Sequence, residues 1–261
     1  MNNRLLKRQI ELCEARVAYA LATVVEVLGS SSAKPSAKAL FDEQGKLTAG
    51  WVGGGCAQAI IGKTALNCIS TGEPDMIEVD LNDEVFGAGM PCGGHMRVYV
   101  EPVLPNPTLW LMGHGRIVET LCSFANRLGF DVIVNDAMAE LQAFPDALRV
   151  VNDDIRYSQL SPKNGDYVVI ASHHKGDFDS LSRAIRSPAR YIALVSSRKR
   201  ARLVLDRLGG EGFSEEELGK VHAPAGLDLG AKLPEEIALS VLSEMVMVRR
   251  EGNGGAMNEI R

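Results

Sequence analysis

The sequence predicts an α/β protein with two domains: an N-terminal α/β domain with cysteine-bearing loops, and a C-terminal Rossmann-like domain built on a doubly wound parallel sheet. In the second half, continuous apolar segments alternate with helix-length segments, which is typical of parallel strands covered on both faces. A Gly-His-Gly turn follows the first of these apolar segments. The proline-rich segment 102–107 separates the two halves. The predicted domains are residues 1–104 and 105–251, followed by a flexible tail at 252–261.

Length and composition indicate an ordinary globular protein. The 261 residues are enough for two domains. A formal net charge of −5 gives no electrostatic reason to expect nucleic acid or an anionic membrane as a partner. No apolar run approaches the ~20 residues of a membrane span, and the N-terminus lacks a signal-peptide core. We therefore expect a cytoplasmic protein whose five cysteines are reduced.

The first half is predicted to pack helices on a sheet. Segment 19–27 is rich in β-branched residues and indicates a buried strand. Residues 40–41 and 47–52 form a hairpin that leads into a glycine-rich loop, and further strands are expected at 76–79 and 96–103. The first helix would bury an apolar face made of Leu5, Leu6, Ile10, Leu12 and Cys13.

The glycine-rich loop Gly53-Gly54-Gly55-Cys56 is the first candidate site. Apolar residues after Cys56 recur with helical spacing, which places this cysteine at the N-terminal end of a helix. Unpaired N–H groups and the helix dipole there favour an anion and a reactive thiolate. The glycines leave their backbone N–H groups open to an oxyanion or phosphate. The alternative is a tight strand-to-helix turn that ends in an inert, buried cysteine.

A second loop begins with Gly29, Ser30 and Ser31 and continues with small polar residues. Its hydroxyls and amides, with Lys34 or Lys38, could bind a phosphate. A merely solvated loop is the alternative reading of the same composition.

A third, longer loop covers residues 81–95. It contains Gly93 and Gly94 beside Cys92 and His95. Long glycine-rich loops of this kind tend to be functional, because a plain connection is usually shorter.

The second half carries the Rossmann-like pattern, with strands predicted at 109–112, 131–134, 149–151, 167–171 and 191–195. Gly113, His114 and Gly115 open a helix after the first strand, and Asp136 closes the second strand about 20 residues later, as in dinucleotide-binding folds. The turn would hold a diphosphate at the helix terminus, and Asp136 would accept a ribose hydroxyl. An ordinary first turn with a capping aspartate is the alternative. Val118 occupies the third position of the pattern, where glycine or alanine is usual.

Two further strand ends lie at the sheet edge where open α/β sheets bind ligands. His173 and His174 follow the fourth strand, and as adjacent residues with diverging side chains they suit polar contacts better than a shared metal. Ser197 and Arg198 follow the fifth strand and could hold a phosphate. The final helix is expected at 234–250 and, being apolar over most of its surface, is expected to be buried.

Seven motifs occur in an order that resembles the XdhC/CoxI family, and the resemblance covers nearly the whole chain. The motifs are Gly29 to Ser31, Gly54 to Cys56, Cys92 to Gly94, the turn at Gly113, His173-His174, Ser197-Arg198, and Pro224 to Asp228 ahead of 234–238. The resemblance implies an accessory protein, closer to a chaperone than to a catalyst, for molybdenum hydroxylases such as xanthine dehydrogenase and aerobic carbon monoxide dehydrogenase.

The resemblance also implies a cargo and partners. The protein would bind molybdenum cofactor, as molybdopterin or its cytosine dinucleotide form, hold it during sulfuration, and pass it to an apo molybdenum hydroxylase. A cysteine desulfurase-type sulfur donor is the second implied partner, and apolar surface on the final helix allows a homodimer. Cys56 or Cys92 would approach the metal or accept sulfur, while Gly54, Gly55 and the Gly113 turn bind phosphates in one site spanning both domains. Gln58 stands where the family has an acidic residue.

Two other functions fit parts of the sequence. One is an NAD(P)-dependent oxidoreductase that uses the second domain, although Val118 and the lack of an evident proton-relay pair argue against it. The other is a copper or zinc chaperone. Cys56, Cys92 and His95 are soft or borderline ligands suited to Cu(I), and such a site would fit the family branch that serves carbon monoxide dehydrogenase, whose own site needs copper.

Overall fold

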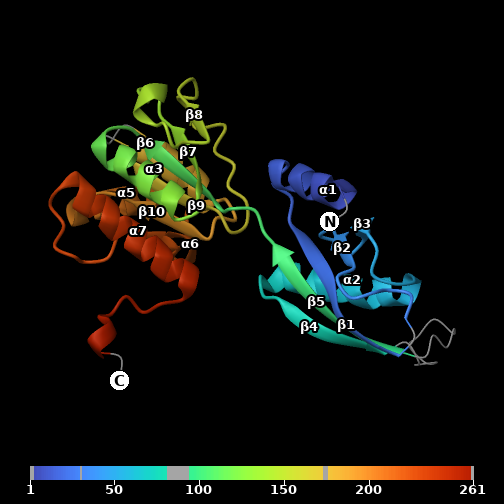
Figure 1. Cartoon of the computed structure of the whole chain (residues 1–261). Helices are drawn as coiled ribbons and strands as arrows, with labels where there is room; N and C mark the ends of the chain where they lie inside the picture. Colours follow the sequence, from blue (N-terminus) through green and yellow to red (C-terminus); the bar gives the residue numbers. More distant parts are fainter. Residues whose placement is uncertain (1–2, 30, 81–93, 173–175, 260–261) are drawn as a thin grey trace. The chain divides into compact units, whose positions relative to one another are not determined.

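The computed structural model describes residues 3–29, 31–80, 94–172 and 176–259. The chain forms two compact units, Met1–Pro105 and Asn106–Arg261, and each unit has its own sheet (Figure 1). The division falls within the proline-rich segment. None of the described helices is long and apolar enough to cross a membrane.

The first unit contains an antiparallel sheet with the strand order β3-β2-β1-β5-β4. The strands are β1 (Tyr19–Gly29), β2 (Lys38–Phe41), β3 (Leu47–Gly50), β4 (Asp75–Asp80) and β5 (Gly94–Val103). The predicted hairpin is confirmed, because β2 and β3 pair directly.

Two helices cover opposite faces of this sheet. Helix α2 (Gly55–Thr71) packs on the face that includes Phe41, whereas α1 (Asn3–Glu14) packs on the face that includes the neighbouring Leu40. The predicted apolar face of α1 is partly wrong. Leu5 and Leu12 are buried, but Leu6 and Ile10 are 41% and 49% exposed, because α1 packs mainly against β2 and β3 at one edge of the sheet.

The second unit confirms the predicted doubly wound parallel sheet. Its strand order is β11-β10-β9-β6-β7-β8, and every pair is parallel. The order reverses between β6 and β9, which is the place where such sheets bind ligands. The strands are β6 (Thr108–Gly113), β7 (Asp131–Asn135), β8 (Arg149–Val151), β9 (Tyr167–Ala171), β10 (Tyr191–Leu194) and β11 (Val221–His222).

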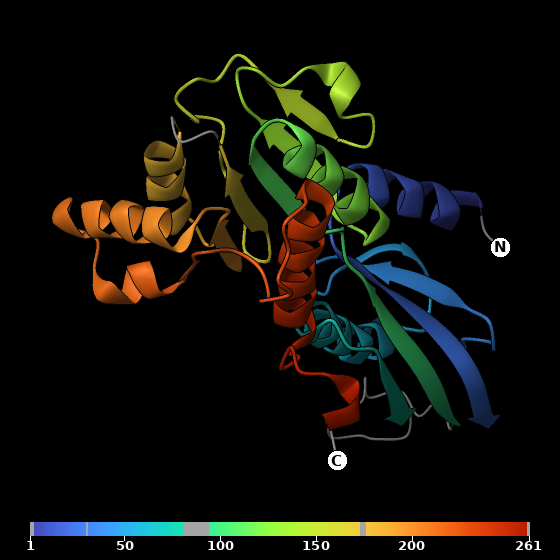
Figure 2. The ribbon, with the colours of Figure 1, turned by 90° about the vertical axis from the view of Figure 1, so that its left-hand side faces the viewer.

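Helices cover both faces of the parallel sheet. Figure 2 shows α3 (Arg116–Arg127) and α7 (Pro234–Arg250) side by side on one face. Helices α4 (Asp177–Ile185) and α5 (Arg198–Gly210) cover the other face, and the short α6 (Glu215–Gly219) packs beside α5. The expected burial of α7 is correct only for one side, since Leu239 on its outer side is 51% exposed.

The link between β8 and β9 is irregular. Residues 152–166 are all described and contain no helix, although a crossover between parallel strands usually has one. Tyr157 and Leu160 from this link are buried in the same core cluster as α4 and α5. The two side chains thus cover sheet surface that a crossover helix would otherwise cover.

Candidate functional site

Three of the predicted motifs gather at one end of the first unit. Gly29, the last residue of β1, lies opposite Gly94, the first residue of β5. The Gly53 turn belongs to the same end, because a Cβ on Gly53 would lie 3.6 Å from Cε of Met96, two residues further along β5. Helix α2 begins there (Figure 1). Cys56 lies in its first turn. The antiparallel register therefore brings together segments that are far apart in the sequence.

The backbone conformation explains glycine at position 53 but not at positions 54 and 55. Gly53 has a φ of +124°, a conformation that side chains rarely adopt. Gly54 has an ordinary φ of −69°, and a Cβ on either Gly54 or Gly55 would meet no described atom within 4 Å. Neither backbone strain nor packing against the described residues requires glycine at these two positions. Among the described residues, their missing side chains leave space in front of the α2 N-terminus, where backbone N–H groups can approach a ligand.

Gln58 stabilises this loop from inside the helix. Its Nε2 donates to the carbonyl oxygen of Gly53 at 2.9 Å. An acidic side chain at this position could not donate that hydrogen bond when ionised. The side chain that departs from the family pattern thus has a structural role in this chain.

The described cysteines differ in accessibility. Cys68 and Cys122 are buried, and burial raises the pKa of both thiols, that of Cys122 to about 12. Cys13 is exposed on α1, away from the glycine loops. Cys56 is partly buried at the α2 N-terminus and is the described thiol closest to the candidate site. Cys56 is therefore not fully buried, and its reactivity stays a prediction.

Other predicted residues of the first unit have partners of their own. The Oγ of Ser31 accepts from the amide of Ala33 at 3.2 Å. Lys38 donates to Thr23 Oγ1 at 2.6 Å, so its ammonium is directed at β1. His95 is exposed, with Nδ1 at 3.6 Å from Asp80 Oδ1.

The predicted metal site stays a prediction. Within the described ranges, no group of three or more His, Cys, Asp or Glu side chains could hold a metal ion. The proposed ligands were Cys56, Cys92 and His95, and Cys92 lies outside the described residues. Ser30, Gly93, His173 and His174 lie outside them as well.

The first turn of the parallel sheet is built on glycines that the backbone requires. Gly113 has a φ of +146°, and a Cβ on it would overlap the carbonyl of Ala171 in the neighbouring strand β9. Gly115 has a φ of +85° and precedes the first residue of α3. These glycines allow the tight turn that ends with α3 pointing its N-terminus at the sheet edge.

His114 and Asp136 pair at this edge. His114 Nδ1 lies 3.0 Å from Asp136 Oδ1, and the amide of Met138 donates to the same oxygen at 2.8 Å. The other carboxylate oxygen, Oδ2, accepts no hydrogen bond from a described residue. Asp136 therefore has one carboxylate oxygen without a described donor, and its binding of a ribose hydroxyl stays a prediction. The same arrangement would suit a nicotinamide dinucleotide, so that alternative also stays a prediction.

At the end of strand β10, one of the two predicted phosphate ligands caps the following helix. Ser197 Oγ accepts from the amide of Arg200 at 3.2 Å and so caps α5. Arg198 is 89% exposed on its side chain and lies 3.8 Å from Asp228. Arg200 is more strongly held, because its Nε donates at 3.2 Å to Asp177, which is 2% exposed. The binding of phosphate by Ser197 and Arg198 stays a prediction.

The sequence did not reveal a buried polar network under the last strand. Glu244 on α7 accepts hydrogen bonds from Tyr191, from His222 Nδ1 at 2.9 Å and from the amide of Gly226 at 2.8 Å. Burial alone would raise the pKa of Glu244, but these hydrogen bonds hold it below its usual value. The carboxylate fixes His222 and the loop after β11 at the sheet edge where ligand binding is predicted. The only sequence signal was one acidic residue inside an otherwise apolar helical run.

Two family models match the chain. Residues 109–245 match the XdhC Rossmann domain, and residues 12–80 match the XdhC and CoxI family. The first match covers the parallel sheet with its Gly113 turn. The second covers the glycine loop and Cys56.

Curated relatives include proteins of Escherichia coli and Bacillus subtilis. YqeB of Escherichia coli is 29% identical over 256 residues, which are 95% of this chain and 46% of YqeB. A protein of Bacillus subtilis named as a probable xanthine dehydrogenase component is 28% identical over 160 residues, 59% of this chain and 46% of that protein. The chain thus spans about half the length of these two relatives. The molybdenum cofactor insertion chaperone PaoD of Escherichia coli is 24% identical over 280 residues, 94% of this chain and 88% of PaoD.

A solved structure has a similar fold. A crystal structure described as a xanthine dehydrogenase from Bacillus halodurans aligns with a TM-score of 0.51 and 22% identity, covering 95% of this chain and 98% of the other. The family model of the Rossmann domain matches more than half of the sequence, on the unit that contains the predicted dinucleotide-type turn. The chain therefore belongs to the XdhC and CoxI family.

Proposed function

We propose that this protein acts in the maturation of a molybdenum enzyme. It binds molybdenum cofactor as cargo, holds it while a terminal sulfur is installed, and passes it to an apo molybdenum hydroxylase of the xanthine dehydrogenase or carbon monoxide dehydrogenase type. Family membership supports this role, as does the relative PaoD, whose name describes it as a molybdenum cofactor insertion chaperone. We expect an accessory protein, with a cysteine desulfurase-type enzyme as the sulfur donor.

The observation that carries the proposal is the open space in front of Gly54 and Gly55. The exposed N–H groups at the start of α2 can bind a phosphate group of the cargo, and the dipole of the 17-residue helix adds to the attraction. Cys56 lies in the same turn, so its soft sulfur ligand would be close to a metal held there. The missing Cβ atoms are explained if a ligand occupies this space.

The second unit is proposed to bind the nucleotide extension of the cofactor. The N-terminus of α3 after Gly115 suits a diphosphate, and the unused oxygen of Asp136 suits a ribose hydroxyl. His114 orients that carboxylate through the hydrogen bond to Oδ1. This part of the proposal requires a dinucleotide form of the cofactor.

Replacing Gly54 by serine tests cargo binding. Serine is a preferred N-cap residue, so α2 should be at least as stable, while its side chain fills the open space. After co-expression with a cofactor pathway, pterin bound to the protein is oxidised and measured by fluorescence. We expect the wild type to retain pterin and Gly54→Ser to lose most of it, with an unchanged melting temperature.

Gly210→Ser is the matched control, because a Cβ at Gly210 also meets no described atom within 4 Å. This variant should retain pterin like the wild type. Full retention in Gly54→Ser would contradict the proposed site. Cys56→Ala then separates two roles: pterin retained with client activation lost indicates sulfur handling, and loss of both indicates cargo binding.

A further inference from the structure

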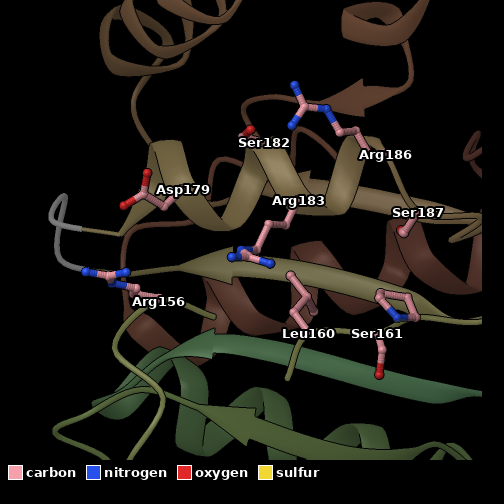
Figure 3. Close-up of a pocket in the computed structure, with 9 residues that line it drawn as sticks. Arg156, Leu160, Ser161, Asp179, Ser182, Arg183, Arg186 and Ser187 are labelled. Atoms are coloured by element: carbon pink, nitrogen blue, oxygen red, sulfur yellow. The ribbon is translucent and has the colours of Figure 1, made fainter. Parts of the chain in front are cut away.

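A groove lined by arginines runs along α4 in the second unit. It has a volume of about 720 Å³ and lies between α4 and the irregular link from β8 to β9. Figure 3 shows Arg156 and Asp179 at one end and Arg186 and Ser187 at the other, with Arg183 reaching from α4 toward Leu160. The lining residues are Arg156, Leu160, Ser161, Pro162, Asp179, Ser182, Arg183, Arg186 and Ser187.

The side chains that line this groove carry an excess of positive charge. Neither Arg156 nor Arg183 forms an ion pair with another described residue, and Asp179 is the one carboxylate among the lining residues. The guanidinium of Arg186 stacks on the ring of Phe213 at 4.7 Å, which leaves its N–H groups free to bond in the plane. Three arginines in one groove form a local concentration of positive charge on a chain whose formal net charge is −5.

The groove is held in place by buried contacts beneath it. Asp154 accepts hydrogen bonds from the amides of Ser158 at 2.8 Å and Gln159 at 2.7 Å, which fixes the turn that carries Arg156. Leu160 packs into the core shared with α4, so the two walls of the groove have a common support. A preformed groove loses little conformational entropy when a ligand binds.

The dimensions favour an elongated ligand. The nine residues of α4 span about 13 Å, a length that about four residues of extended peptide would cover. A single phosphate could reach only part of this distance. A compact polyphosphate would also meet the carboxylate of Asp179, whereas a peptide can donate a backbone N–H to it.

We propose that this groove docks an extended acidic segment of a partner protein. Carboxylates of the segment pair with the guanidinium groups of Arg156 and Arg183, where bidentate hydrogen bonds add geometric specificity. Leu160 and Pro162 are buried at the base of the groove and give the segment an apolar support. The inference concerns protein docking and goes beyond the proposed binding of a cofactor.

The test uses the whole 261-residue chain and a fluorescein-labelled peptide of alternating aspartate and glutamate. Fluorescence anisotropy at low ionic strength measures its dissociation constant. The double variant Arg156→Gln/Arg183→Gln is expected to weaken binding about tenfold, since two charge pairs are lost. The control Arg127→Gln/Arg202→Gln removes the same charge from exposed positions on α3 and α5 and is expected to bind within about twofold of the wild type.

Several results would overturn the inference. The first two are that the wild type does not bind the acidic peptide, and that the groove and control variants lose the same amount of affinity. The third is that a peptide of asparagine and glutamine binds as tightly as the acidic one. The fourth is that inorganic tripolyphosphate binds in an arginine-dependent way and excludes the peptide. Gly54→Ser should bind the acidic peptide normally, because it lies in the other unit. Failure of the docking proposal can therefore be distinguished from failure of the proposed cofactor site.

Discussion

Replacing Asp154 by asparagine removes the carboxylate that organises one wall of the arginine groove. Asp154 is 6% exposed and accepts four hydrogen bonds, two at each oxygen, from Asn135 Nδ2, the amide and hydroxyl of Ser158, and the amide of Gln159. All four partners are donors. An asparagine amide has one NH₂ group in place of a carboxylate oxygen, so this donor would face two of the four donors. Rotating the amide by 180° only changes which two donors it faces.

The magnitude follows from the pKa of this group. Burial alone would raise it, but the hydrogen bonds from Gln159, Ser158 and Asn135 lower the pKa of Asp154 from 3.8 to about 2. A difference of about two units corresponds to about 2 kcal/mol of unfolding free energy. Because the folded-state value is depressed, this stabilisation is fully present above pH 3.8 and is lost as the pH falls toward 2.

Urea unfolding of the second unit measures this effect. Trp110 is buried in that unit and Trp51 lies in the other, so a Trp51→Phe background makes tryptophan fluorescence specific for the second unit. Asp154→Asn should lower the unfolding free energy at pH 7 by about 2 kcal/mol. The difference from wild type should shrink as the pH falls from about 4 toward about 2.

The neighbouring variant Asp153→Asn is the control. Asp153 is exposed and accepts one long hydrogen bond, from Gln159 Nε2 at 3.4 Å. Its substitution should change stability by less than about 0.5 kcal/mol. The reasoning fails if Asp154→Asn is as stable as wild type at pH 7, or if its deficit is the same at every pH in this range.

Two further substitutions test the packing of the second unit. Glu244→Leu removes the carboxylate that accepts hydrogen bonds from three buried or partly buried donors. In the same urea assay it should lower the unfolding free energy by about 2–4 kcal/mol. A neutral result would show that water replaces the carboxylate. Gly176→Ala places a Cβ onto the hydroxyl of Tyr157 and should be strongly destabilising. Combining it with Tyr157→Leu should cost less than the sum of the two single changes, and strict additivity would contradict the contact.

Local sequence patterns predicted the secondary structure well. The helix with Cys56 in its first turn and the final helix at Pro234–Arg250 are both confirmed. These features depend on residues within a few positions of each other, where apolar spacing and capping chemistry decide the conformation. The strands of the parallel sheet were recognisable because burial on both faces makes them continuously apolar.

Features that depend on distant residues were not predictable in the same way. Helix periodicity suggested that Leu6 and Ile10 were buried, but a spacing pattern does not say how wide a surface the helix meets. The partners of Glu244 come from Tyr191 and His222, so its burial depends on sheet order rather than on neighbours in the chain. The proximity of Gly29 and Gly94 likewise follows from strand register.

The position of α7 has a consequence for the synthesis of the protein. The core on its side of the parallel sheet combines α3 with Val241, Leu242 and Met245, which come after every strand of the unit. A nascent chain can therefore fold its first unit early, whereas one face of the second unit's sheet is covered by α3 alone until α7 leaves the ribosome. During that interval the uncovered strands are prone to aggregate, and a holdase that shields them would raise the yield of native protein.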